Sequence, residues 1–224
     1  MNENMRSFLY QLLFSLPATL LAISIHESAH ALVSYLCGDK QVKADGRISL
    51  NPFHHLDLVG TLCLIFFHFG WAKPVVVNTS GYRHKRLDFI LVALAGPLSN
   101  FLLAVLSAFL ECLVYYKMTP GIPKAILFQL LMCLTIIDIG LGVFNLIPIP
   151  PLDGSNVLFS LLPRSVSQKV RQYRRYSPFL LVILLVAFSY IGGGLLSTVN
   201  TSIYNSLIGL FSGLFQASAL PAAV

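Results

Sequence analysis

The fold is decided by residues 8–36, which read FLYQLLFSLPATLLAISIHESAHALVSYL. This apolar run is longer than the ~20 residues that an α-helix needs to cross the hydrocarbon core of a bilayer. It is also too long for the apolar part of a cleavable signal peptide, and no charged segment of the usual kind precedes it. We therefore expect a transmembrane helix, inside which the side chains of His26, Glu27 and His30 need an explanation.

The rest of the chain has the composition of a membrane protein. Of the 224 residues, 56% are hydrophobic and 11% are charged, whereas a soluble domain is about 25% charged. This composition excludes a disordered chain, a disulfide scaffold and a coiled coil. The four cysteines lie in or beside apolar runs without C-x-x-C spacing, which is typical of small core residues.

Further apolar runs predict an all-α polytopic protein with a bundle of about five transmembrane helices. After the first span, the remaining four are expected at Leu87–Tyr116, Ile126–Pro148, Pro178–Leu196 and Ile203–Leu220. The last of these contains several polar residues and could instead lie as a helix in the membrane interface. We expect one integral membrane domain over residues 1–224, with a core near 8–160 and C-terminal helices near 178–220.

The run Leu58–Gly70 is too short to be another span. As a helix its ~13 residues would reach about 20 Å, against a hydrocarbon core of ~30 Å. Both flanks are basic, so a full crossing would place positive loops on opposite sides of the membrane. We expect a re-entrant segment, for which a β-hairpin is one candidate form, buried in protein or lining a wet cavity.

The basic residues predict how the chain is oriented. The formal net charge is +6, and twelve of the 15 Lys and Arg lie in three segments, near 38–56, 72–86 and 163–177. Cytoplasmic loops of membrane proteins are rich in Lys and Arg, and such loops contact anionic lipids. The placement therefore indicates the lipid bilayer as a partner and no nucleic acid, with all three segments on the cytoplasmic side.

The polar residues of the first predicted helix form the pattern H-E-x-x-H, from His26 to His30. Residues four apart lie on the same helix face, so both imidazoles can bind one metal ion. Glu27 lies one position around the helix, where its carboxylate can polarise a water on the metal. Inside an apolar helix these residues cost several kcal/mol unless they face a partner or a wet cavity. The alternative is a polar helix end at the membrane interface.

A catalytic zinc site typically has three protein ligands, so two histidines leave it one short. The best third candidate is Asp153, which follows prolines that end the third predicted helix. Gly154 permits a turn that would aim the carboxylate back at the bundle. The predicted topology places Asp153 at the same membrane side as His26 and His30. The alternative is that an Asp-Gly pair after prolines is only a turn.

These residues together resemble the site-2 protease family of intramembrane zinc metalloproteases, peptidase family M50. The resemblance rests on His26-Glu27-Ser28-Ala29-His30 followed, in the right order, by Asn145 and Leu152-Asp153-Gly154. Further stretches similar to the small bacterial and archaeal branch, without PDZ or CBS domains, are residues 51–57, 70–75 and 93–100.

The resemblance implies one zinc ion per chain, with His26, His30 and Asp153 as ligands. It implies Glu27 as the general base, and Asn145 as a polar helper that orients the substrate or stabilises the oxyanion; Asn145 could equally cap or tie helices together. The substrate would be a transmembrane segment of another membrane protein, cleaved in a prokaryotic cell membrane with the active site toward the cytoplasm. The re-entrant segment would offer a strand edge that holds this substrate extended.

Other readings stay open at this stage. A scaffold that binds client helices without cleaving them has no use for the intact Glu27, and a metal-ion transporter would want more carboxylates along a path. Asp138 stands where the resembled family usually has Asn, and it is either a protonated helix-bonding group or part of a polar path. Asn100 either bonds across helices or helps the site, and Gly96 is expected only to allow close helix packing. Zinc is the default metal for two histidines and one carboxylate, and the spacing does not prove it.

Overall fold

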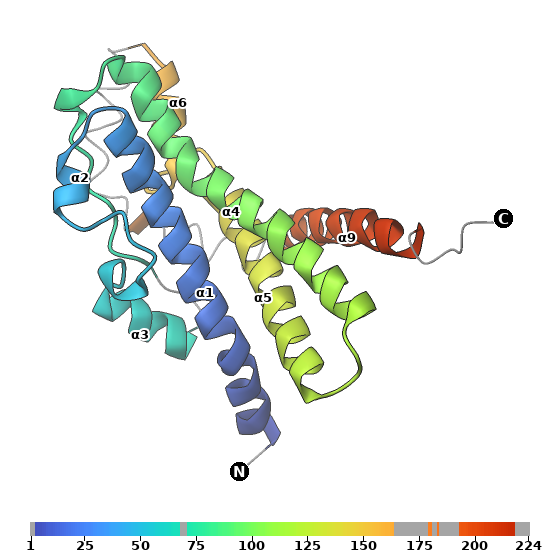
Figure 1. Cartoon of the computed structure of the whole chain (residues 1–224). Coiled ribbons are helices and arrows are strands. Elements are labelled where there is room, and N and C mark those ends of the chain that lie inside the picture. Colours follow the sequence, from blue (N-terminus) through green and yellow to red (C-terminus); the bar gives the residue numbers. More distant parts are fainter. Residues whose placement is uncertain (1–2, 68–70, 164–178, 181–182, 184–192, 218–224) are drawn as a thin grey trace.

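The computed structural model describes residues 3–67, 71–163, 179–180, 183 and 193–217. Three long helices dominate this part of the chain: α1 (Glu3–Leu36), α4 (Lys85–Lys117) and α5 (Ile122–Asn145). Each is long and apolar enough to cross a membrane, and no other helix among the described residues is. Figure 1 shows the three side by side, with α5 beside α4 and α4 beside α1. The all-α membrane fold predicted from the sequence is confirmed.

The short elements lie between and after these helices. They are α2 (Gln41–Ala44), the 3-10 turn η1 (Pro52–His54), α3 (Leu58–Phe67), the 3-10 turn η2 (Thr79–Gly81), α6 (Asp153–Leu161) and α9 (Gly193–Ala217). Within the described ranges the chain forms no β-strand, and its one isolated bridge joins Leu56 to Ala72.

The ends of the long helices follow from local sequence. The Asp88 carboxylate in the first turn of α4 accepts the backbone N–H of His84 at 2.8 Å, which satisfies one of the unpaired N–H groups of a helix start. Helix α5 begins after Gly121 and has a proline in its first turn, where the missing N–H costs nothing. It ends at Asn145, three residues before the Pro148 that the sequence analysis expected to stop it.

Small side chains let α1 approach α5 closely. Ala18 and Ala22 of α1 are almost fully buried against Leu134 of α5. Without a hydrophobic driving force between helices in lipid, such close packing supplies much of the attraction. Large apolar residues such as Leu13 and Leu102 stay 65% and 71% exposed, as expected of helices whose outer faces contact lipid.

The structure of the segment after α2 differs from the form expected from the sequence. Leu58–Phe67 is the helix α3, so the β-hairpin form and the strand edge expected here are wrong for these residues. Apart from Gly60 these ten residues contain no turn signal, and a helix satisfies its own backbone groups. The bridge between Leu56 and Ala72 brings the two flanks together, as a re-entrant course requires, and the entry of this segment into a membrane stays a prediction.

The C-terminal part is described only in places. The expected span Pro178–Leu196 lies almost wholly outside the described residues. The run Ile203–Leu220 falls largely within α9, which contacts α4 and α5 and runs at an angle away from them in Figure 1. Helix α9 is not among the candidate spans.

Candidate metal centre

Three side chains from distant parts of the chain converge at one point. His26 Nε2 and His30 Nε2 lie 3.1 Å and 3.2 Å from the same carboxylate oxygen, Oδ2 of Asp153. The two Nε2 atoms lie 3.1 Å from each other. The structure thus brings together the three residues that the sequence analysis selected as metal ligands, and among the described residues no other group of His, Cys, Asp and Glu side chains could hold an ion.

In each histidine, the hydrogen bond made by Nδ1 determines whether Nε2 has a lone pair free for a metal ion. His30 Nδ1 lies 2.6 Å from the carbonyl oxygen of Val92, which can only accept, so His30 donates from Nδ1. His26 Nδ1 lies 2.5 Å from Oδ1 of Asn100 and donates in the same way. A neutral imidazole that donates from Nδ1 has its lone pair on Nε2. Two lone pairs and a carboxylate oxygen therefore face one another.

This donor set fits a zinc ion. With ligands at about 2.0–2.1 Å, neighbouring ligand atoms of a tetrahedral site are about 3.3 Å apart, close to the observed triangle of 3.1–3.2 Å. Burial raises the pKa of Asp153, but the neighbouring imidazoles of His26 and His30 lower it by more, so the carboxylate is ionised at neutral pH. The ionised carboxylate is the form that binds a cation.

Gly96 of α4 makes room for this triangle. A Cβ added there would lie 2.3 Å from His30 Nε2 and 2.6 Å from His26 Nε2. Such distances are far below van der Waals contact, so every side chain larger than hydrogen would displace the imidazoles. From the sequence we expected this glycine only to allow helix packing; the structure places it against the two metal-binding atoms, a proximity that sequence spacing does not show.

Asp153 is held in place at both ends of α6. Gly154 packs against the chain just after α5: its added Cβ would lie 2.2 Å from the carbonyl oxygen of Leu146. Gly154 is therefore a helical residue needed for close packing, and not the turn residue that we expected. At the far end, the Arg86 guanidinium donates to the carbonyls of Ser160 and Leu161 and ties α6 to the start of α4.

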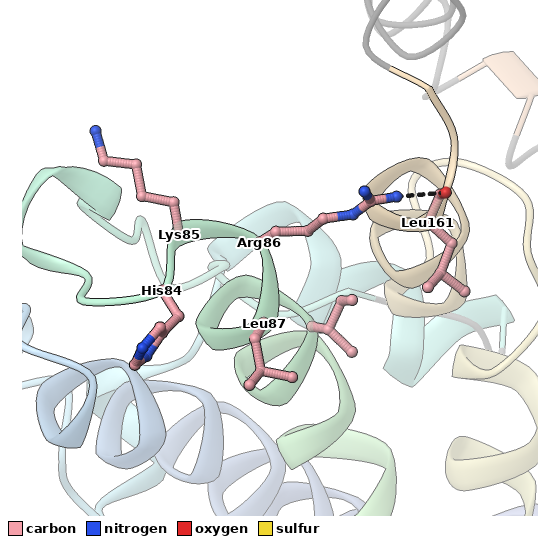
Figure 2. A pocket seen from close by; sticks show the side chains of 6 residues that line it. His84, Lys85, Arg86, Leu87 and Leu161 are labelled. Carbon is pink, nitrogen blue, oxygen red and sulfur yellow. Dashed lines mark hydrogen bonds between the residues drawn. The ribbon is translucent and has the colours of Figure 1, made fainter.

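Arg86 also lines an open pocket of about 640 Å³ between α4 and α6 (Figure 2). Apolar side chains make up most of its wall, and His84 and Lys85 are the other polar residues there. None of the three candidate ligands lines it, so this pocket is separate from the metal centre. Its contribution to the site is indirect, through the contact of Arg86 with the end of α6.

Glu27 faces the loop that follows α3. The backbone N–H of Val75 donates to Glu27 Oε2 at 3.1 Å. The same loop is tied to the protein on either side, because Lys73 N–H donates to the carbonyl of His55 at 2.8 Å and Asn78 N–H to Asp39 Oδ2 at 2.7 Å. We call residues 72–78 the strap. No sequence signal marks Val75, since a backbone donor leaves no trace in residue type.

Asn145 does not make a hydrogen bond to the triangle in this structure. Its Nδ2 donates to the carbonyl oxygen of Leu141, one turn back in α5, at 3.1 Å. This bond stays within α5, so the amide is turned toward its own helix in this structure. Its role in catalysis stays a prediction.

Comparisons with known proteins indicate the family of the chain. The sequence profile of Peptidase family M50 matches residues 116–186, a stretch that includes Asn145 and Asp153. A Bacillus subtilis (strain 168) protein named "Putative zinc metalloprotease YwhC" is 35% identical over 223 residues, which cover 95% of this chain and 99% of that protein.

More distant relatives carry the same kind of name. Two proteins named "Putative zinc metalloprotease Rip2", from Mycolicibacterium smegmatis and Mycobacterium tuberculosis H37Rv, are 28% and 30% identical over 173 and 175 residues. These alignments cover 75% of this chain and 64% of each relative. No solved structure matches the chain. On the profile match and the full-length relative, this integral membrane protein belongs to peptidase family M50, the site-2 protease family that its motifs resemble.

Proposed function

We propose that this protein is an intramembrane zinc metalloprotease that hydrolyses peptide bonds within or next to transmembrane segments of other membrane proteins. The observation that carries the proposal is the triangle of His26 Nε2, His30 Nε2 and Asp153 Oδ2, whose three acceptor atoms point at one another. Both imidazoles donate from Nδ1, so neither has a proton on Nε2 to share with Asp153. A cation between the three acceptor atoms would satisfy all of them. Family membership makes zinc the expected ion.

The chemistry divides between the ion and one side chain. Zinc, when bound, acts as a Lewis acid that polarises the scissile carbonyl and makes water acidic enough to lose its proton near neutral pH. Glu27 then accepts the proton of the attacking water and delivers it to the leaving amine. The hydrogen bond from the Val75 N–H to Oε2 limits the rotation of the Glu27 carboxylate and leaves Oε1 available for this proton transfer.

Asn145 is proposed as the donor that stabilises the developing oxyanion. A preorganised donor of this kind contributes about 3 kcal/mol to a transition state. Its amide now donates to Leu141, so the proposal requires that the side chain turns away from its own helix when substrate is bound. Loss of Asn145 should therefore cost less than loss of Glu27.

The active site is proposed to face the cytoplasm. The metal-binding residues lie toward the end of the bundle where α1 ends and α4 begins (Figure 1). Basic residues between α1 and α4 gather at this end, whereas Lys117 and Lys124 lie at the connection between α4 and α5. Such a distribution favours this end as the cytoplasmic side.

The substrate must be unwound to be cut, since a helix hides its scissile bond. With α3 helical, we propose that the strap, which passes Glu27 at Val75, is the part of the chain that runs beside an extended substrate. The strap is not helical over residues 72–78, and since the N–H groups of Lys73, Val75 and Asn78 bond within the protein, an extended substrate would pair with its remaining backbone groups.

The test combines metal content with cleavage. We would purify the wild type, His26→Ala and Glu27→Gln in detergent without chelators, measure bound metal by mass spectrometry, and assay cleavage of a reporter transmembrane substrate. We expect about one zinc ion per chain in the wild type and in Glu27→Gln, none in His26→Ala, and cleavage in the wild type alone.

The other outcomes separate the rival functions. Zinc in the wild type together with equal cleavage by Glu27→Gln would overturn the general-base role. A wild type that binds no divalent metal would overturn the metalloprotease proposal as a whole. Zinc uptake into vesicles that depends on His26, without cleavage, would favour a transporter.

A further inference from the structure

We propose that Asn100 and Asp138 are positioning residues that hold His26 in the tautomer and orientation that bind the metal ion. The inference rests on the proposed function, because it assigns both residues a role toward the same metal centre. It starts from one chain of hydrogen bonds that crosses three helices: Asp138 on α5, Asn100 on α4 and His26 on α1.

The amide of Asn100 can lie only one way round. Its Nδ2 contacts Asp138 Oδ1 at 2.5 Å and the carbonyl oxygen of Ala22 at 3.3 Å, and both of these atoms accept hydrogen bonds. The NH₂ group therefore faces α5 and α1, which leaves Oδ1 facing His26 Nδ1 at 2.5 Å. With the amide reversed, an NH₂ group would face His26 Nδ1, and the proton of the imidazole would move to Nε2, the atom that must bind the metal.

The two histidines differ in how much help they need. His30 donates to the backbone carbonyl of Val92, which is part of α4 and cannot turn over. His26 depends instead on a side-chain amide, which can rotate by half a turn and exchange its acceptor for a donor. Acceptors on the far side of Asn100 remove that freedom, and Asp138 at 2.5 Å is nearer than the Ala22 carbonyl at 3.3 Å.

Asp138 has no other evident use. It is fully buried, and within the described part of the chain its Oδ2 has no hydrogen-bond partner. Its hydrogen bond to Asn100 through Oδ1 is thus the contact that compensates for burying a carboxyl group in an apolar helix. Groups that orient metal-binding histidines in this way usually change metal affinity about 10–100-fold when removed.

A purely structural role is the alternative, and the chain offers a matched control for it. Thr135 lies one turn before Asp138 on α5, is also fully buried, and also bonds to α4, through the hydroxyl of Ser107 at 2.9 Å. It is not connected to His26. If Asp138 only joins α4 to α5, replacing Thr135 should affect the site equally.

The experiment measures metal binding apart from cleavage. Purified wild type, Asp138→Leu, Asp138→Asn, Asn100→Leu, Thr135→Val and the double variant Asn100→Leu with Asp138→Leu would be titrated with Zn²⁺ against a chromophoric chelator. The visible spectrum of each Co²⁺-loaded form would report the ligand geometry. The thermal stability of each metal-free form would detect variants that do not fold.

We expect Zn²⁺ affinity to fall about 10–100-fold in Asp138→Leu and at least as far in Asn100→Leu, with altered Co²⁺ spectra. Asp138→Asn, whose amide oxygen can still accept from Asn100, and Thr135→Val should both stay within about threefold of wild type. Because Asp138 acts through Asn100, the double variant should be no weaker than Asn100→Leu alone.

Three results would overturn the inference: wild-type affinity in Asp138→Leu, an equal loss in Thr135→Val, or additive losses in the double variant. Each would leave the proposed function intact if the wild type binds zinc and cleaves in a Glu27-dependent manner. A wild type without metal would overturn both, so the two failures are distinguishable.

Discussion

Two groups of polar side chains join different sets of helices in this protein, the first α1 and α6, the second α4, α5 and α9. One is the metal triangle of His26, His30 and Asp153, where three acceptor atoms lie 3.1–3.2 Å apart. The other joins Glu111 of α4 to Tyr204 of α9, whose hydroxyl donates to the carboxylate at 2.6 Å. Thr135 of α5 adds a second hydroxyl at 3.5 Å from that carboxylate.

The two groups differ in whether hydrogen-bond donors face their acceptor atoms. Around Glu111 each carboxylate oxygen faces a hydroxyl group, so the group satisfies itself and joins three helices. In the triangle every proton that could help is already committed to Asn100 or Val92, and the acceptors are left facing each other. A polar residue inside a membrane helix therefore indicates a metal site only where the matching donors are missing.

The most direct test of this difference is to neutralise one carboxylate in each group. Asp153→Asn should lose nearly all bound zinc, to below about 0.1 ion per chain, and all detectable cleavage, because a neutral amide is a poor third ligand. Glu111→Gln should keep zinc and cleavage, since its amide oxygen can still accept from Tyr204. Metal analysis of both purified variants checks the pair. Equal metal loss in both would show that the groups do not differ as described.

A second pair tests the space around the triangle. Gly96→Ala should reduce zinc affinity about 100-fold or more, because its methyl group would overlap both imidazoles and shift the ligands from their productive positions. Gly213→Ala in α9, where nothing lies within 4 Å of the added methyl, should leave affinity unchanged. Chelator competition measures both. Normal zinc binding by Gly96→Ala would mean that the helices separate easily at this point.

A third pair tests the strap. Val75→Pro removes the N–H that holds Glu27, and the loss of a hydrogen bond to a charged group, about 1.5–3 kcal/mol, predicts a kcat roughly 10–100-fold lower with zinc retained. Val76→Pro places the same ring at the next position, where the side chain is 82% exposed, and should have a small effect. Steady-state cleavage by both variants decides. A fall in both would indicate general damage to the strap.

Parts of this site could be predicted from sequence because they depend on local spacing. The helical separation of His26 and His30 and the helix stop before Asp153 are properties of short segments, and the structure brings these residues together. Gly96, the Asn100–Asp138 contact and Val75 act across helices that are distant in sequence, so no single segment encodes their partners. The helical form of α3 was missed because a short apolar run fits a strand or a helix equally well.

We expect the smallest effect on catalysis at the group formed by Glu111, Tyr204 and Thr135. Tyr204→Phe leaves the Glu111 carboxylate buried without its nearer donor and removes a link between α9 and α4. The free energy of unfolding should fall by about 1–3 kcal/mol, while zinc content and cleavage at low temperature stay near wild type. Tyr116→Phe is the matched control, because its hydroxyl contacts Gln216 of α9 at an exposed position and should change stability by less than about 0.5 kcal/mol. Thermal denaturation measures both. If Tyr204→Phe lowered zinc affinity instead, the two groups would be coupled through α4. The distinction between structural and metal-binding polar residues would then be wrong.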